Sequence, residues 1–232
     1  MFTLHYAPDN ASLIVRMVLD ELGVPFDTRL VDRSTRQQDS AAYRALNPAG
    51  LIPVLETPGG PLSETAAILL WLSEHEGSLA PQPGDAQRGA FLKTLFFVSN
   101  TLHSDLRQVF YPAQYVGADT RAQHLLHATV TARVHRHFGI VEDVAQAGVP
   151  WLGAAEPSVL DFYVAPLLRW AQIYGGVAQG WFDLSAFAAL RAMARGLEGR
   201  PSVARASRAE GLGAAPFTEP GPCSPPEGSA LG

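Results

Sequence analysis

The chain has 232 residues, a formal net charge of −5, 47% hydrophobic residues and 17% charged residues. This composition is typical of folded globular proteins and far from that of disordered chains. The negative net charge excludes the broad positive field that attracts nucleic acid or an anionic membrane. The longest apolar runs, such as residues 66–72, are much shorter than the roughly 20 residues of a membrane span. We therefore predict a folded protein of two domains, without nucleic-acid or membrane partners.

Cysteine usage and the first residues also limit the function classes. The single cysteine, Cys223, lies in a segment rich in Pro, Gly and Ser, so neither an intramolecular disulfide nor a cysteine zinc site can form. The pairs His124/His127 and His135/His137 lack a carboxylate or cysteine at helical spacing, which favours solvated helix faces over a metal site. Met1 and its neighbours do not resemble a signal peptide. We expect a cytoplasmic protein without a metal cofactor.

The first quarter of the chain predicts a strand, a helix and a second strand. Residues 2–6 form a β-prone run, and residues 7–10 (Ala-Pro-Asp-Asn) favour a turn. A helical apolar pattern begins at Ser12 and ends before Gly23, which suits a C-cap. Residues 26–31 alternate between inward and outward positions, so we predict a strand parallel to the first through a βαβ crossover.

The next segment predicts a hairpin followed by a helix. Residues 32–43 are polar and predict a loop or a short helix. Residues 52–56 predict a third strand, and Pro-Gly-Gly at 58–60 predicts a hairpin turn. Ser63 is a candidate N-cap for a helix over residues 64–76. The expected order is βαβ, a short helix, then ββα.

A linker and a helical half follow. Two prolines and a glycine interrupt residues 79–85, which indicates a domain boundary. Beyond it the helical pattern recurs over residues 86–110, 119–147, 158–175 and 184–196. We therefore predict an α/β domain over 1–78, the linker 79–85, an all-helical domain over 86–210 and a disordered tail over 211–232.

Residues 47–56 and the start of the following helix carry the most informative pattern. A cis bond before Pro53 would turn the N–H and C=O of Ile52 toward a ligand. Glu64 and Thr65 open a helix whose free N–H groups and dipole can hold a carboxylate, while Glu64 pairs with an amine. The α-amino acid end of a ligand carries both charges and fits this arrangement.

These segments resemble the glutathione-binding half of the cytosolic glutathione transferase superfamily, in which a thioredoxin-like domain precedes an all-helical one. The resemblance implies that Ile52 before cis-Pro53 binds the cysteinyl part of glutathione. It implies also that Glu64 and Thr65 bind the γ-glutamyl end. One polar or basic residue of the loop over 36–38 would meet the glycyl carboxylate; the sequence does not single it out, and Gln38 is the candidate we choose. The structural alternative is an ordinary strand proline followed by a helix-capping acidic pair.

A second resemblance lies in the helical half, at Ser158 and Asp161. Ser158 at an N-cap and Asp161 three residues later form a relative of the capping box, which is worth about 1 kcal/mol. The family has the same box on its central buried helix. We assign Asp161 a structural role, and the resemblance extends over residues 1 to about 210.

The catalytic position departs from the family pattern. Asn10 stands where serine-type members carry serine, and Ala11 stands where bacterial cysteine-type members carry cysteine. A donor aimed at the glutathione sulfur from a helix N-terminus lowers its pKa. Ser12 ranks first as that donor and Asn10 second, because both lie at the helix start. The alternative for Ser12 is a plain N-cap. Tyr6 is the third candidate, with a core position as its alternative.

The helical half supplies candidates for the second substrate. His103 resembles the histidine that bacterial members place beside the sulfur, and an imidazole with a pKa near neutrality can assist proton transfer. A structural hydrogen bond is its alternative. Phe110, Tyr111 and Tyr115 would form an apolar wall tipped with hydroxyls, or else pack between helices.

The resemblance thus implies a homodimeric, detoxification-type glutathione transferase of bacterial kind. Such an enzyme activates the thiol of its co-substrate glutathione for attack on a small hydrophobic electrophile. Two alternatives stay open: a glutathione-dependent disulfide reductase or peroxidase, and a glutathione-binding or ligand-carrying protein without turnover.

Overall fold

The computed structural model of the chain describes residues 1–228, and residues 229–232, the end of the predicted tail, lie outside the described part. The chain divides into two compact units. Unit 1 contains residues 1–82, 198–216 and those from 221 onward, and unit 2 contains residues 83–197 and 217–220. Each unit is described by itself.

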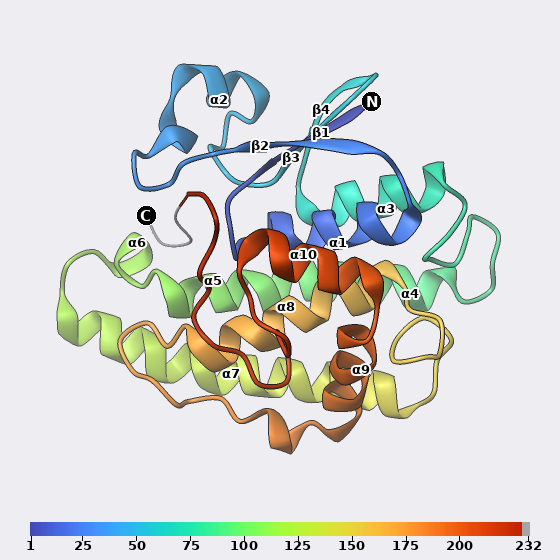
Figure 1. The fold of residues 1–232 in the computed structure, drawn as a ribbon. Helices are drawn as coiled ribbons and strands as arrows, with labels where there is room; N and C mark the ends of the chain where they lie inside the picture. The colour runs from blue at the N-terminus through green and yellow to red at the C-terminus, as the bar shows by residue number, and fades with distance from the viewer. Residues whose placement is uncertain (229–232) are drawn as a thin grey trace. The chain divides into compact units, whose positions relative to one another are not determined.

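Unit 1 is built on a four-stranded mixed sheet (Figure 1). Its strands are β1 (Phe2–Tyr6), β2 (Phe26–Leu30), β3 (Val54–Thr57) and β4 (Gly60–Ser63), in the order β2-β1-β3-β4. β1 is parallel to β2 and antiparallel to β3, and β3 is antiparallel to β4. The predicted βαβ unit and hairpin are therefore confirmed, and so is the fold class.

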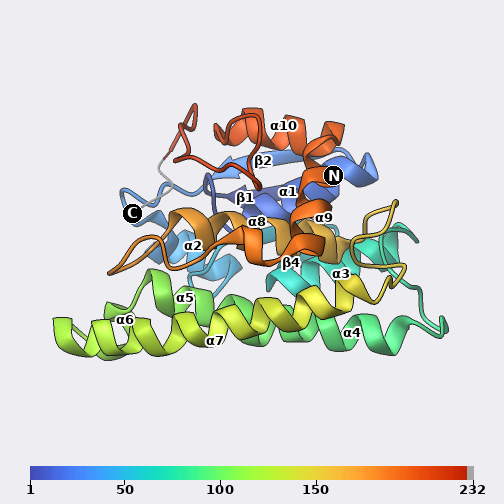
Figure 2. The same cartoon turned by 90° about the horizontal axis from the view of Figure 1, so that it is seen from below.

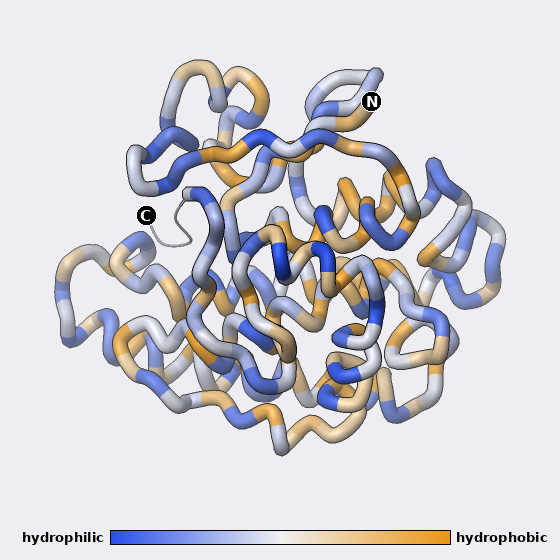
Figure 3. Tube along the Cα trace, in the orientation of Figure 1, coloured by the Kyte–Doolittle hydropathy of each residue, from blue (hydrophilic) through white to orange (hydrophobic). Residues whose placement is uncertain are grey.

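The helices of unit 1 bury apolar faces that their sequences predict. They are α1 (Ser12–Leu22), α2 (Ala41–Leu46), α3 (Thr65–His75) and α10 (Pro201–Glu210), with a short 3-10 turn η1 (Gln37–Asp39). The first eight residues of α1 are buried, and it ends at Gly23, whose φ of 67° is a left-handed C-cap. β2, in contrast, is exposed at its centre and hydrophilic there (Figure 3).

Helix α10 belongs to unit 1 although it lies far from the sheet in sequence. It packs along α1, where the Arg200 guanidinium pairs with the Glu21 carboxylate. This differs from the continuous helical domain over 86–210 that the sequence predicts. Pro201 at the first helical position and Gly211 as a left-handed C-cap are the local signals that could have indicated α10.

Unit 2 is all-helical within the described residues, as predicted. Its elements are α4 (Arg88–Phe97), the π-helical η2 (Val98–His103), α5 (Ser104–Phe110), α6 (Ala113–Val116), α7 (Thr120–Gln146), α8 (Val159–Ile173), η3 (Leu184–Ala186) and α9 (Ala188–Glu198). The long α7 runs beside α5 and η2 (Figure 2). Across residues 1–228, no helix combines the length and apolarity that crossing a bilayer requires.

The buried helix α8 begins at the predicted capping box. Ser158 Oγ accepts from the N–H of Leu160 at 3.0 Å, and the Asp161 carboxylate accepts from the N–H groups of Ser158 at 2.8 Å and Gly153 at 2.7 Å. Burial raises the pKa of Asp161 to about 6, against the opposing effect of these hydrogen bonds. Asp161 thus has the structural role assigned to it.

The segment from residue 211, expected to be disordered, makes contacts as far as 228. Leu212 in unit 1 and Phe217 in unit 2 are buried. The N–H of Ser224 donates to the carbonyl of Gly211 at 2.8 Å. A few apolar anchors and main-chain hydrogen bonds offset the ordering entropy of this Gly/Pro-rich stretch. Cys223 is partly buried within it.

Candidate functional site

The predicted ligand-facing peptide lies at the entry to β3. The Ile52–Pro53 peptide bond is cis, as expected. The pairing register of β3 with β1 and β4 begins only at Val54, two residues later than the predicted strand start. The main-chain groups of Ile52 therefore lie outside the strand ladder, so they can serve a ligand.

The turn before Ile52 is held by side chains of α2 and its C-cap. Tyr43 Oη and Asn47 Nδ2 both donate to the carbonyl of Leu51, at 2.9 Å and 2.8 Å. Gly50 has a φ of 65°, and a Cβ added there would stand 3.1 Å from the carbonyl oxygen of Gln38. The backbone thus approaches closely where glycine alone fits without strain.

The start of α3 offers uncapped N–H groups. The helix begins at Thr65, and Glu64 is the N-cap, so the predicted capping role of Ser63 is wrong: it closes β4. Glu64 has a φ of 68°, and no side chain accepts a hydrogen bond from the first turn. A non-glycine residue rarely adopts this conformation, and uncapped N–H groups bind anions. Glu64 is exposed and Thr65 is buried.

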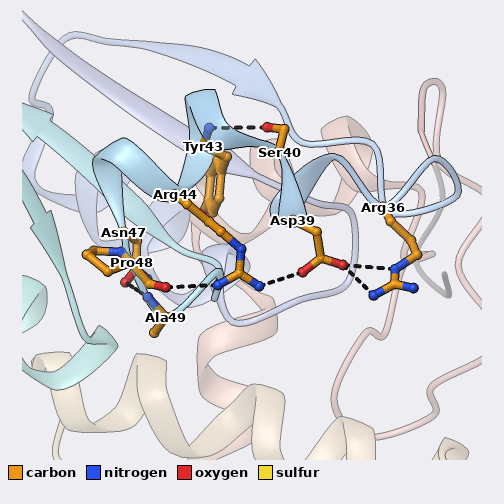
Figure 4. Close-up of polar contacts among 8 residues, drawn as sticks. All are labelled: Arg36, Asp39, Ser40, Tyr43, Arg44, Asn47, Pro48 and Ala49. Carbon is orange, nitrogen blue, oxygen red and sulfur yellow. Dashed lines mark hydrogen bonds and ion pairs between the residues drawn. The ribbon is translucent and has the colours of Figure 1, made fainter.

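Charged side chains near the start of α2 form an ion-pair chain (Figure 4). Asp39 pairs with the guanidinium groups of Arg36 at 2.7 Å and Arg44 at 2.8 Å, and Arg44 also donates to the carbonyl of Pro48 at 3.0 Å. These hydrogen bonds, first from Arg36 and then from Arg44, lower the pKa of Asp39. One carboxylate between two guanidinium groups leaves this segment net positive.

Gln38 lies within the same segment. Its buried Oε1 has no hydrogen-bond partner among residues 1–228. A buried amide oxygen without a partner is uncommon in a folded protein and calls for a ligand or an ordered water. Gln38 was chosen from the sequence as a glutathione contact, and this free oxygen is a feature the sequence alone does not indicate.

The first loop separates its two leading donor candidates. Ser12 is fully buried, and its Oγ accepts from the N–H of Ala7 at 3.2 Å and donates to the Ala7 carbonyl at 3.1 Å. Its single hydrogen is therefore used within the loop. Asn10 is only half-buried, and its Oδ1 accepts from the N–H of Ala11 at 2.8 Å. This orientation leaves the Nδ2 hydrogens of Asn10 for a ligand.

Tyr6 occupies the core position given as its alternative. Its ring is buried under the guanidinium of Arg16, 4.5 Å from the ring centroid, and its hydroxyl donates to the Glu227 carboxylate. Burial, followed by the hydrogen bond and charge of Glu227, raises the pKa of Tyr6. The phenol therefore already has an acceptor within unit 1.

In unit 2, His103 ends the π-helical η2. Its Nδ1 lies 3.1 Å from the hydroxyl of Tyr163, and the rings of Tyr163 and Trp170 stand 5.7 Å and 5.8 Å from its own. Burial, and next the charge of Arg107, lower the pKa of His103 to about 4. The imidazole is therefore neutral at pH 7, and a neutral ring can donate or accept a hydrogen bond.

The three aromatic residues proposed for the second substrate differ in exposure. Phe110 packs edge-on against Tyr111 and Tyr174, at 6.5 Å and 6.0 Å between centroids. Arg107 lies 5.8 Å from the centroid of the Tyr111 ring. Tyr115, on α6, is 45% exposed. Phe110 and Tyr111 are thus partly buried and in contact with other rings, whereas Tyr115 is exposed.

The histidine pairs of α7 make structural contacts. His127 is buried and its Nε2 lies 2.8 Å from the carbonyl of Gly175, so the expectation of a solvated face is wrong for His127. His137 Nε2 lies 3.0 Å from the carboxylate of Asp105. Within residues 1–228 no cluster of three or more His, Cys, Asp or Glu side chains is placed to hold a metal ion.

Comparisons with known proteins agree with this architecture. The family "Glutathione S-transferase, N-terminal domain" matches residues 11–75, and "Glutathione S-transferase, C-terminal domain" matches residues 118–204. A solved sphingomonad glutathione S-transferase, complexed with glutathione, is 30% identical, with 91% of this chain and all of that chain covered and a TM-score of 0.74. The chain belongs to the glutathione S-transferase family. The predicted enzyme class is thus confirmed, and glutathione is the co-substrate of this family.

Curated relatives place this glutathione transferase among bacterial members. "Glutathione S-transferase GST-4.5" of Xanthomonas campestris pv. campestris is 29% identical over 90% of this chain and 98% of its own length. A maleylpyruvate isomerase of Ralstonia sp is 31% identical, over 47% of this chain and 52% of its own length.

One group near the first loop was missed by sequence reasoning. Glu210, at the end of α10, accepts a hydrogen bond from the N–H of Asp9. The helix over residues 201–210 was not predicted from the sequence, and the Pro201 and Gly211 signals that could have indicated it do not show that Glu210 contacts the first loop.

Proposed function

We propose that this glutathione transferase binds glutathione in unit 1 and lowers the pKa of its thiol for attack on a small apolar electrophile. The observation that carries the proposal is the combination, within one unit, of a free main-chain peptide at Ile52 and an uncapped helix start at Glu64 and Thr65. The two features match the central cysteinyl part and the γ-glutamyl end of glutathione. The sphingomonad relative was solved with glutathione bound.

Each part of glutathione has a proposed partner. The main chain of Ile52 beside Pro53 takes the cysteinyl part through antiparallel hydrogen bonds. The first-turn N–H groups of α3 and Thr65 take the γ-glutamyl carboxylate, and exposed Glu64 takes its ammonium. Gln38 takes the glycyl end, since its segment is net positive and suits the carboxylate, while its unpartnered Oε1 can accept from the glycyl N–H.

The amide of Asn10 is the proposed thiol activator. Its Nδ2 hydrogens are free, whereas the hydroxyl hydrogen of Ser12 is used by the Ala7 carbonyl. A hydrogen bond to the ionised form of a group lowers its pKa. The geometry therefore supports Asn10 ahead of Ser12, and gives Ser12 the role of closing the loop.

Unit 2 is proposed to supply the contacts of the second substrate. Tyr115 offers an exposed ring, and His103 offers a neutral imidazole that can donate a hydrogen bond to an electrophile. We propose also that the enzyme acts as a homodimer in the cytoplasm.

The first test is glutathione binding and thiol ionisation. We expect retention on immobilised glutathione, release by free glutathione, and an ultraviolet-titrated thiol pKa below the free value. Asn10→Ala should raise the bound thiol pKa by about one unit, since one hydrogen bond to a charged group is worth roughly 1.5 kcal/mol. Asn100→Ala, an exposed position of η2, is the control. Failure to bind would overturn the proposal, and binding with an unshifted thiol pKa would favour a carrier protein.

A second candidate function is glutathione-dependent isomerisation, which the partial match to maleylpyruvate isomerase favours. There the thiolate adds to a carbon–carbon double bond, the new single bond rotates, and elimination releases the thiolate unchanged. Rates on a chloro-nitroaromatic compound, a cis-enedioic acid and a hydroxyalkyl disulfide would distinguish transferase, isomerase and disulfide reductase. Conjugation of the chloro-nitroaromatic compound should dominate if the main proposal holds.

A further inference from the structure

Glu210 holds the first loop from the opposite end of the chain. It is fully buried as the last residue of α10. Its Oε2 accepts from the N–H of Asp9 at 2.8 Å, and its Oε1 accepts from Nε of Arg16 at 2.8 Å. One carboxylate therefore connects the loop before α1 with the second turn of α1.

The loop residue that Glu210 holds has an unusual backbone. Asp9 has a φ of 50°, in the left-handed region that non-glycine residues seldom adopt. Such a conformation persists only where surrounding contacts fix it. The hydrogen bond to Glu210 is such a contact, and the next residue is Asn10, the proposed thiol donor.

The other polar contacts between α1 and α10 lie at the far end of the pair. The Glu21 carboxylate accepts from Arg200 and Ser202, and the Asp20 carboxylate accepts from Arg205 at 2.9 Å. They can dock α10 without touching the loop. A buried ion pair adds little stability compared with two well-packed apolar side chains. Docking of α10 therefore does not by itself explain why an acidic residue is buried at position 210.

We infer that Glu210 is a positioning residue for thiol activation: by fixing the Asp9 backbone and Arg16, it sets where Asn10 presents its amide. This inference rests on the proposed function, in which Asn10 faces the sulfur. Without the carboxylate, Asp9 relaxes out of its left-handed conformation and Asn10 moves with it. The glutathione contacts at Ile52, Glu64 and Thr65 belong to other elements and stay in place.

The test compares Glu210→Gln with Glu21→Gln in the full-length chain. A glutamine at 210 must turn its NH2 toward one of two donors, so it cannot hold both Asp9 and Arg16. Glu21→Gln weakens the same helix pair away from the loop. Amide hydrogen exchange of residues 7–13, the bound thiol pKa and the dissociation constant for glutathione are measured for both.

For Glu210→Gln we expect exchange in residues 7–13 to accelerate about tenfold or more. We also expect the bound thiol pKa to rise by about half a unit or more, with glutathione affinity changed less than threefold. Glu21→Gln should change neither exchange in the loop nor the thiol pKa. Equal effects of the two variants, or an unchanged loop in Glu210→Gln, would overturn the inference.

A second variant and the binding result for wild type distinguish failure of the inference from misfolding and from failure of the proposed function. If Glu210→Gln does not fold, Glu210→Asp retains the charge but is one methylene too short to reach both donors, and the same readouts apply. If wild type fails to bind glutathione, the proposed function fails. In that case, faster amide exchange in residues 7–13 of Glu210→Gln would show only that Glu210 stabilises the first loop. The inferred role of Glu210 in thiol activation would be overturned together with the proposed function.

Discussion

The side chains of the first loop differ in which hydrogens they have left to donate. The hydroxyl of Ser12 donates to the Ala7 carbonyl, and the hydroxyl of Tyr6 donates to the Glu227 carboxylate. Asn10, in contrast, only accepts a hydrogen bond through its side-chain oxygen. An amide is a weaker donor than a cationic group, but a preorganised one stabilises developing charge without reorganisation. Loss of the familiar serine and cysteine therefore still leaves a route to thiolate stabilisation.

His103 gives a prediction about acid stability. Its pKa is 6.5 in an exposed chain and about 4 in the folded protein, because burial disfavours the imidazolium. Between these values the unfolded state binds the proton and the folded state does not, so stability falls as the pH drops. Relative to His103→Gln, wild type should lose up to about 2 kcal/mol of unfolding free energy between pH 7 and pH 4.5.

Urea unfolding at the two pH values measures this difference. His124→Gln, at an exposed position of α7, is the matched control and should show the same acid loss as wild type. An acid loss in His103→Gln as large as that of wild type would show that His103 has the same pKa in the folded and unfolded chain, and would contradict the prediction.

At the scale of elements, α10 is the unexpected part of unit 1. Its apolar face, with Val203 and Ala206 almost fully buried, lies in the same unit as α1 and the sheet. A thioredoxin-like sheet covered by α1 alone on this side would expose the α1 face that α10 packs against. The segment after residue 197 thus completes the fold of unit 1.

Substitution on the buried face of α10 tests this role. Val203→Asp places a charge among apolar groups and should cost roughly 3 kcal/mol or more of unfolding free energy. Arg208→Gln changes an exposed position of the same helix and should stay within about 0.5 kcal/mol of wild type. Chemical denaturation followed by circular dichroism gives both values; equal midpoints would contradict a docked α10.

At the scale of the whole molecule, we expect a homodimer. Phe96 on α4 and Ile140 on α7 are each 49% exposed, and a subunit interface would bury apolar side chains of this kind. Analytical ultracentrifugation should give about twice the chain mass of 24.9 kDa, and Phe96→Glu should raise the dimer dissociation constant tenfold or more. A single species of chain mass at micromolar concentration would rule out a stable dimer.

Local patterns in the sequence were sufficient for much of the fold. The βαβ order, the cis peptide before Pro53, the Gly23 C-cap and the Ser158–Asp161 box each depend on residues close together in the chain. Turn chemistry, helix caps and apolar periodicity act over a few residues, so they can be read without knowing the packing. The resemblance to glutathione transferases likewise depends on short segments of sequence that can be recognised one by one.

Only the tertiary structure decided which polar groups are left free in the first loop, where the proposal places the glutathione sulfur. The contact of Glu210 with Asp9 spans 201 residues of sequence, and that of Glu227 with Tyr6 spans 221. Burial that lowers the pKa of His103 likewise comes from neighbours on α8. Such contacts follow from how distant elements pack, and no pattern along the chain specifies them. The sequence by itself determined the family and the segments proposed to hold glutathione, and packing determined which donor remains free for the proposed thiol activation.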